Sequence, residues 1–169
     1  MSESSEAENE QWRKTGILRP EDVDLPDEGK LEDNAIAVIE CPQKIPCNPC
    51  EENCPVGAIK LEDLNAIPKV DTEKCTGCSI CVQQCPGLAI FMVEYTGDDK
   101  CEITIPYEFE LPEEGEEIEA LNRKGEKVCI GNVTDTLPRE KSVGDTPTLT
   151  IEVPREFANI VRSIRRKNR

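Results

Sequence analysis

The sequence predicts an α+β fold in which a cysteine-rich segment of short helices and strands precedes a small antiparallel β domain and an amphipathic C-terminal helix. Eight of the ten cysteines lie between residues 41 and 90, which defines the first part. Apolar and polar residues alternate over residues 103–111 and 149–153, with the period of half-buried strands. From residue 157 apolar residues recur at helical spacing and predict one apolar stripe.

Composition limits both the size of the core and the kinds of partner. At 169 residues the chain has room for one ordinary domain or two small ones. Aromatic residues make up only 4%, so apolar burial is thin and a metal centre can contribute to folding. The net charge of −15 repels phosphates, so we expect no nucleic-acid partner. Because the chain has no histidine, His-based acid–base chemistry and metal sites with His ligands are excluded.

The second half of the cysteine-rich segment carries the most specific pattern. It reads Cys75-x2-Cys78-x2-Cys81-x3-Cys85-Pro86, the spacing of bacterial iron–sulfur proteins. Thiolates select iron–sulfur clusters or zinc. The alternative of a zinc ribbon would have two CxxC pairs around a longer spacer, whereas here two groups of four cysteines each end in CxxxCP. The spacing therefore favours iron–sulfur clusters.

An internal repeat with an offset of 31 residues relates the two halves of this segment. Its matched cysteines are Cys47 with Cys78, Cys50 with Cys81 and Cys54 with Cys85. Lys44 stands where the counterpart of Cys75 would fall, and Cys41, three residues earlier, is the substitute that we expect to act as ligand. If Cys41 did not reach the site, the site would hold a three-iron cluster or a four-iron cluster with one open position.

On these motifs, residues 41–95 resemble a bacterial ferredoxin with two [4Fe-4S] clusters, and the resemblance covers about a third of the chain. In such domains the fourth cysteine of each run ligates the other cluster. The resemblance implies that cluster one is held by Cys41, Cys47, Cys50 and Cys85. It implies for cluster two the ligands Cys75, Cys78, Cys81 and Cys54. It also implies a β-α-β repeat, with short helices that begin near Cys50 and Cys81 and strands over 58–61, 67–71 and 89–94.

We expect four segments, at residues 1–34, 35–95, 96–154 and 155–169. The first is an acidic arm, of which residues 1–11 are predicted to be disordered. The rest of the arm is either a solvated tail or a segment that folds on a partner protein, with Trp12 and the Ile17-Leu18 pair as anchors. The apolar run Ala35–Ile39 opens the second segment as a buried strand.

The third segment is predicted to be a small antiparallel β domain. Alternation over 103–111 indicates a strand that Pro106 either splits or restricts to a sheet edge. A turn at 123–125 joins strands over 118–121 and 128–133, and residues 149–153 form another strand. Cys101 and Cys129 fall on different strands, and we expect them to be buried free thiols that pack as small apolar residues.

The last segment is predicted to be a basic amphipathic helix that starts after Pro154. Its apolar stripe is Phe157, Ile160, Val161 and Ile164, and its 15 residues carry six bases and one acid. The helix either covers the β domain, with its bases near the negative end of the helix dipole, or docks on an acidic partner surface.

For function, the sequence predicts an electron-transfer iron–sulfur subunit without catalytic residues of its own. The layout resembles ferredoxin-like subunits of flavin- or NAD(P)-dependent oxidoreductases, such as amino-acid dehydrogenase complexes, and implies such a partner. No G-x-G-x-x-G occurs, so a flavin or nicotinamide would sit on that partner. The alternatives are a diffusible ferredoxin, a zinc- or cluster-stabilised non-redox interaction module, and an enzyme built on an open iron position.

The polar residues 1–6 contain no apolar signal segment, and no run of about 18 apolar residues occurs. These features predict a protein that does not insert into membranes. Because its many cysteines need a reducing compartment, we expect it to be cytoplasmic.

Overall fold

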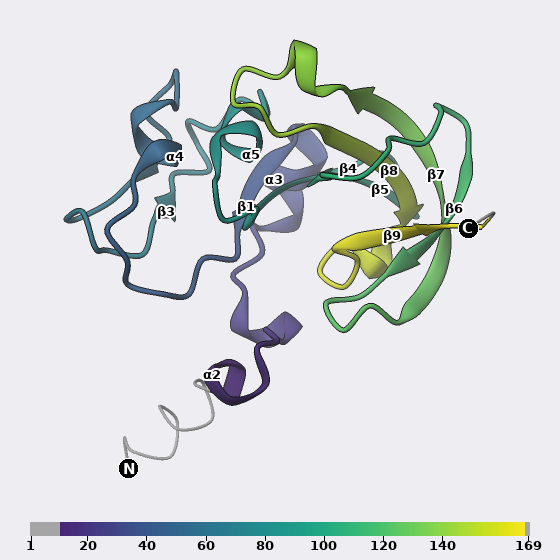
Figure 1. The fold of residues 1–169 in the computed structure, drawn as a ribbon, viewed down its shortest axis with the longest axis horizontal. Coiled ribbons are helices and arrows are strands. Elements are labelled where there is room, and N and C mark those ends of the chain that lie inside the picture. Colours follow the sequence, from purple (N-terminus) through teal and green to yellow (C-terminus); the bar gives the residue numbers. More distant parts are fainter. Residues whose placement is uncertain (1–10, 168–169) are drawn as a thin grey trace.

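Seven antiparallel strands of residues 11–167, the part of the chain that the computed structural model describes, form one curled sheet (Figure 1). In spatial order they are β1 (Ile36–Ile39), β4 (Ile90–Tyr95), β5 (Lys100–Pro106), β8 (Thr148–Pro154), β7 (Lys127–Leu137), β6 (Glu117–Leu121) and β9 (Ser163–Arg166). The predicted disordered stretch lies outside the described residues, except for Gln11. The predicted hairpin of β6 and β7 is confirmed, with Gly125 in its turn at φ +77°.

Strands β1 and β4 are buried on both faces, because they separate two cores. Ile36 and Val38 pair with Val93 and Phe91, and all four belong to the large core inside the curled sheet. The alternate positions on the same two strands, which include Ala37 and Met92, pack into a second core with the cysteine-rich segment. Two-sided burial explains why the predicted strand at Ala35–Ile39 is uniformly apolar.

The cysteine-rich segment forms two short helices and a small hairpin beside the sheet (Figure 1, left). Helix α4 (Pro49–Glu52) packs against α5 (Ile80–Gln84), and β2 (Ile59–Lys60) pairs with β3 (Lys69–Val70). Both predicted helices and all three predicted strands therefore occur at the expected places. The division at residues 95 and 96, a boundary that stays a prediction, falls between β4 and β5, two neighbouring strands of the same sheet.

From residue 18 onward the N-terminal arm packs on its own chain, so this part of it is not a solvated tail. It contains α2 (Gln11–Thr15), the 3-10 helix η1 (Pro20–Asp22) and α3 (Glu28–Asp33). Val23 and Leu31 are buried in the large core, with Leu18 and Leu25 packed against it. Trp12 is half-buried, and the Arg13 guanidinium stacks 4.7 Å from its ring centroid. Figure 1 shows α2, the first described element of the arm, projecting from the body of the molecule.

The predicted C-terminal helix is wrong. Only the 3-10 helix η3 (Arg155–Phe157) forms, and the chain then enters strand β9, which pairs with β6. Val161 and Ile164 are buried in the large core, so the apolar positions were identified but their conformation was not. The bases do not complete a helix dipole, because Arg166 pairs with Glu116 at 2.8 Å and the neighbouring bases on either side of it pair with glutamates of β6.

Strand β5 also differs from its prediction. It lies between β4 and β8 in the middle of the sheet, not at an edge, and Pro106 is its last residue. Ile103, Ile105 and Tyr107 are buried as the alternation predicts, whereas Phe109 is 72% exposed. Proline is tolerated because the ladder ends there.

The loop between β7 and β8 is held against helix α5 by side-chain hydrogen bonds. The buried Gln83 side chain accepts the Val143 N–H at 2.9 Å and the Ser142 hydroxyl at 3.3 Å. Gln84 donates in return to the Val143 carbonyl at 3.1 Å. Gly144 lies so close to α5 that a Cβ there would collide with the Gln83 carbonyl oxygen. The C-terminal strands therefore support the helix of the second cysteine motif.

We expect Gly144→Ala to destabilise the chain by about 1–3 kcal/mol, because the added methyl must displace backbone atoms of α5. The measurement is the apparent Tm of the cluster-loaded protein under anaerobic conditions. Gly29→Ala is the matched control, since Gly29 lies in the first turn of α3, a Cβ there meets nothing within 4 Å, and alanine favours the helix. Equal Tm values for the two variants would show that the close contact between Gly144 and α5 does not contribute to stability.

Candidate iron–sulfur site

The eight predicted site cysteines fall into two spatial groups that exchange their last members. Cys41 and Cys50 each interact electrostatically with Cys47 and with Cys85, a residue of the second motif. In the other group Cys81 interacts with Cys75 and Cys78 of its own motif. It also interacts with Cys54, a residue of the first motif. The two groups have the same members as the two ligand sets that the ferredoxin resemblance implies, and Cys41 lies in the first of them. The role of these cysteines as ligands stays a prediction.

The first group surrounds a small cavity. All four of its cysteines line this cavity together with apolar side chains, among them Ile39, Ile45 and Ile90. Soft sulfur ligands around a space with apolar walls suit an iron–sulfur cluster, because such walls limit the access of water to the metal. Within residues 11–167, no three cysteines or carboxylates meet the spacing of ligands to one single metal ion.

The second group lies nearer to solvent on one side. Cys81 is buried in the smaller core, Cys54 and Cys75 are half-buried, and Cys78 is exposed. The edge of this group at Cys78 is therefore open to solvent or to a partner, whereas the first group contains no exposed cysteine.

Burial raises the pKa of three of the site thiols. Burial, followed by the neighbouring Cys85, raises the pKa of Cys50 to about 11 and also raises the pKa of Cys41. Burial, followed by Cys75 and Cys78, raises the pKa of Cys81 to about 12. Gathering several thiolates in a low dielectric is unfavourable unless a cation compensates them, and a coordinated thiol is deprotonated outright. Cys41, Cys50 and Cys81 are therefore protonated at neutral pH without metal and would lose their protons on coordination.

Backbone N–H groups point at sulfur at the same place in both repeats. The Ala58 N–H donates to Cys54 Sγ at 3.2 Å, and the Ala89 N–H donates to Cys85 Sγ at 3.4 Å. Burial alone would raise the pKa of Cys54, but backbone N–H groups of residues 56–59 outweigh it and lower that pKa. Hydrogen bonds to sulfur are one of the means by which a protein sets a cluster's reduction potential.

The turn that aims these N–H groups uses left-handed backbone in both repeats. Gly57 has φ +62°, and its counterpart Leu88 has φ +52°. Leucine is sterically disfavoured in that region, so the conformation is imposed by the surrounding motif. The strain at Leu88 is not visible in the sequence, because only the first repeat carries glycine at this position.

The loop of the second motif is attached to the start of β1. The Asn34 side chain donates to the Cys75 carbonyl at 2.9 Å. Gly77 has φ +72°, and a Cβ there would meet Asn34 Oδ1 at 2.7 Å and the Ala35 carbonyl at 2.9 Å. Glycine is thus required at position 77 both by the turn and by close approach. Asn34 is a supporting residue that the motif pattern does not indicate.

The two remaining cysteines belong to neither group: Cys101 lies in the large core, and Cys129 packs against it. Cys101 is fully buried on β5, Cys129 is half-buried on β7, and both are free thiols. Burial, followed by the neighbouring Cys129, raises the pKa of Cys101 to about 12. At neutral pH Cys101 is therefore a protonated, apolar packing residue, as the sequence predicts.

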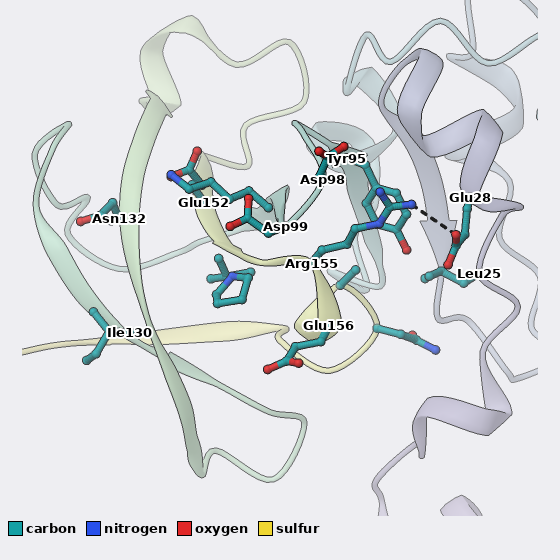
Figure 2. A pocket seen from close by; sticks show the side chains of 15 residues that line it. Leu25, Glu28, Tyr95, Asp98, Asp99, Ile130, Asn132, Glu152, Arg155 and Glu156 are labelled. Carbon is teal, nitrogen blue, oxygen red and sulfur yellow. Dashed lines mark hydrogen bonds and ion pairs between the residues drawn. The ribbon is translucent and has the colours of Figure 1, made fainter.

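A wide acidic cleft of about 810 Å³ opens beside the sheet, and no cysteine is among its described lining residues (Figure 2). Arg155 extends from the end of β8 over the Tyr95 ring, with 3.9 Å between the guanidinium and the ring centroid. The same guanidinium pairs with Glu28 at 3.3 Å and with Glu32 at 2.8 Å. These contacts attach α3 to the sheet, so we assign the walls of the cleft a structural role.

Comparison with known proteins identifies the domain to which this part of the chain belongs. Residues 43–89 match the family model of the 4Fe-4S dicluster domain, a span that holds seven of the eight site cysteines and begins two residues after Cys41. The chain therefore contains a ferredoxin domain of the dicluster type. No solved structure gives a significant match.

Several curated proteins are similar to this domain. The chain is 42% identical over 64 residues to a protein of the ion-translocating oxidoreductase complex of Methanosarcina acetivorans, covering 38% of this chain and 22% of the relative. It is 52% identical over 44 residues to an uncharacterized ferredoxin of Methanocaldococcus jannaschii, covering 26% and 28%. It is 45% identical over 49 residues to the pyruvate synthase subunit PorD of that organism, covering 29% and 56%. The chain thus spans only about a quarter of the first two relatives. No helix within residues 11–167 has the length and apolar character needed to cross a membrane.

Proposed function

We propose that this chain is an electron-transfer subunit that passes single electrons through two [4Fe-4S] clusters to or from a larger oxidoreductase. The observation that carries the proposal is the exchange of cysteines between the two spatial groups, with Cys85 beside the first motif and Cys54 beside the second. This exchange is the ligand pattern of two-cluster ferredoxins. The clusters, when bound, accept and release one electron at a time.

In this proposal cluster one is held by Cys41, Cys47, Cys50 and Cys85, and cluster two by Cys75, Cys78, Cys81 and Cys54. The cavity that all four cysteines of the first set line supports that set, including Cys41. The N–H groups of Ala58 and Ala89 stabilise negative charge on sulfur as electrons arrive. The apolar walls restrict water, which lowers the dielectric around the first set.

The proposed partner is a flavin- or NAD(P)-dependent oxidoreductase, which would carry the substrate chemistry. Two of the relatives are named as subunits of an ion-translocating oxidoreductase complex and of pyruvate synthase, and a third is named as the electron transfer subunit of a thiosulfate reductase. The arm and the strands outside the ferredoxin domain are structure that a small diffusible carrier does not require. A diffusible ferredoxin is the second candidate, and it predicts purification without a partner.

A group of exposed apolar side chains next to the first motif supports docking at that end of the molecule. Ile45 and Ile67 are 41% and 40% exposed and line one groove, which also reaches Cys41. Leu64 is 53% exposed, and its carbonyl accepts the Cys47 N–H at 3.2 Å. Exposed apolar side chains around a cofactor are typical of a protein–protein contact.

We expect Leu64→Asp to lower the amount of oxidoreductase that co-purifies with the tagged chain from its native host by about tenfold, the effect of losing about 1.4 kcal/mol of binding energy. Iron content and spectra should not change, because Leu64 is not a ligand. Phe109→Asp is the matched control, since Phe109 is 72% exposed but lies in the sheet half. Equal recovery with both variants would contradict docking through this group.

The proposed function is tested by counting the electrons that the chain delivers. The reconstituted protein is reduced with excess dithionite, desalted anaerobically and mixed with oxidised cytochrome c. Two clusters predict the reduction of about two cytochromes per chain, in a fast phase. If almost no cytochrome is reduced although the metal content is intact, the chain is a structural module. If about one cytochrome is reduced per chain, only one redox-active cluster is present, which contradicts the proposal of two.

A further inference from the structure

We infer that Glu40, held between Arg123 and Arg162, is a positioning residue for Cys41 and thereby ties cluster one to the C-terminal strands. The inference rests on the proposed role of Cys41 as a ligand, and it concerns how that ligand is brought to its place. None of the three charged residues belongs to the repeated motif.

The three side chains form a buried, fully bonded network. Arg123 donates to both carboxylate oxygens of Glu40, at 2.9 and 2.6 Å, and Arg162 donates to Glu40 Oε1 at 2.5 Å. The two guanidiniums also share Asn159, whose side-chain oxygen accepts from both at 3.1 Å. Arg162 further donates to the carbonyls of Ala158 and Val161, at 2.8 and 2.6 Å. Each polar group has a partner, so the geometry is fixed.

The charged side chains of this network are almost completely shielded from solvent. The side chains of Glu40, Arg123 and Arg162 are only 7%, 8% and 4% exposed. Burial by itself would raise the pKa of Glu40, but the hydrogen bonds and charges of the two arginines outweigh it and hold that pKa below its usual value. Burial lowers the pKa of Arg162, which Glu40 only partly offsets, although a guanidinium keeps its proton at neutral pH. Glu40 is therefore a carboxylate locked between two cations.

The network joins the two edge strands of the curled sheet, and it does so at the residue directly before Cys41. Glu40 directly follows β1, one edge strand, and Arg162 directly precedes β9, the other. The Glu40 N–H donates to the Ala89 carbonyl at 2.7 Å, which extends the β1–β4 ladder by one residue. The Ala89 N–H in turn donates to Cys85 Sγ. One hydrogen bond between residues 40 and 89 thus sets the backbone of Cys41 relative to Cys85.

This arrangement accounts for the irregular first motif. In the second motif Cys75 is held by its own loop, through its N–H to the Asp71 carbonyl at 3.1 Å and through Asn34. Cys41 is instead separated from Cys47 by a stretch that contains two prolines and the exposed Lys44. A ligand displaced from the repeat by three residues is positioned from its N-terminal side, by β1 and the charge network.

The test compares variants of the full chain, reconstituted anaerobically with iron and sulfide. Cys41→Ala gives the spectrum of a cluster one that lacks its fourth ligand. Glu40→Gln is expected to reproduce that EPR change, with iron falling by about one to four atoms per chain and cluster two unaltered. Glu116→Gln is the matched control, because Glu116 also binds an arginine through two bonds, at 2.8 and 2.9 Å, between β6 and β9. It should leave both signals intact.

A double variant separates position from charge. Glu40→Gln with Arg123→Met keeps the native net charge of the network, because it removes one acid and one base. A positioning role predicts that the double variant still lacks the native cluster-one signal, whereas recovery of that signal would overturn the inference in favour of a charge effect. If Glu40→Gln does not fold, Arg123→Lys decides, since lysine keeps the charge but lacks the fork that holds both oxygens.

The outcomes distinguish this inference from the proposed ligand set. Unchanged iron and spectra in Cys41→Ala would remove Cys41 from the ligands and the inference with it. A changed Cys41→Ala spectrum together with native signals in Glu40→Gln would overturn the inference alone. Arg123→Lys should alter the EPR signal or the reduction potential of cluster one while cluster two stays native, and a native cluster one in that variant would equally contradict a positioning role.

Discussion

Replacing Cys85 by alanine is expected to deplete the cluster of the first motif, although Cys85 belongs to the second. The reason is that Cys85 lies with Cys41 and Cys50, while Cys81 in the same helix region lies with Cys54. Iron should fall from about eight to as few as about four atoms per chain, because a cluster that loses a thiolate is lost or degrades. The EPR signal that remains should be the one that Cys78→Ala removes.

Cys54→Ala is the reciprocal experiment, and it should remove the signal that Cys85→Ala leaves. Cys101→Ala serves as the control, since Cys101 is a buried free thiol outside both groups and should not change iron content. If each variant instead lost the cluster of its own motif, the cysteines would not cross over, and the two spatial groups would not be the ligand sets.

Removal of iron is expected to unfold the cysteine-rich half and to spare the curled sheet. The smaller core has only seven buried residues in the described part of the chain, and two of them are the site cysteines Cys50 and Cys81, so its stability depends on the metal. The large core contains a continuous set of buried residues from β4 to β9 and contains none of the site cysteines except Cys75 at its margin. Loss of the clusters should therefore act locally rather than on the whole chain.

Hydrogen exchange of the apo and cluster-loaded chain measures this difference. Amides of α4, α5 and the β2–β3 hairpin should exchange in the apo form at rates close to those of an unfolded chain, whereas β5, β7 and β8 should keep most of their protection. Strand β4 is the most informative element, because it borders both cores. Loss of protection throughout the sheet would mean that the chain folds as one cooperative unit with its clusters.

Motif spacing accounts for most of the correct predictions about the ferredoxin domain. Cysteine spacing and the closing prolines are local features, so they predict the helices at Cys50 and Cys81 and the small hairpin without knowledge of the rest of the fold. The run Ala35–Ile39 is likewise readable as a strand. Its sequence does not reveal the second core on its other face, because part of that core comes from β4, whose paired residues lie more than 50 positions away.

The C-terminal segment shows why periodicity fails for short elements. Phe157, Val161 and Ile164 are spaced to suit one helical face, and the last two of them are indeed buried. The open edge of β6 decides the conformation instead, since it offers backbone hydrogen bonds to Ser163–Arg166 and carboxylates to the arginines. A strand of four residues is too short for sequence periodicity to distinguish from a helix.

The charge network could not be predicted from the sequence for a different reason. Glu40 is 83 residues from Arg123 and 122 residues from Arg162, so no local pattern connects them. Each reads as an ordinary surface charge in an acidic chain. Only the closure of the sheet, which brings β1 toward β9, places them together and buries them.

The most direct test of the central claim is EPR spectroscopy of the anaerobically reconstituted chain during a reductive titration, with iron and sulfide counted on the same sample. We expect about eight irons per chain and two one-electron centres whose reduced signals interact. Zinc in place of iron, or a single centre with about four irons, would contradict the proposed electron-transfer function.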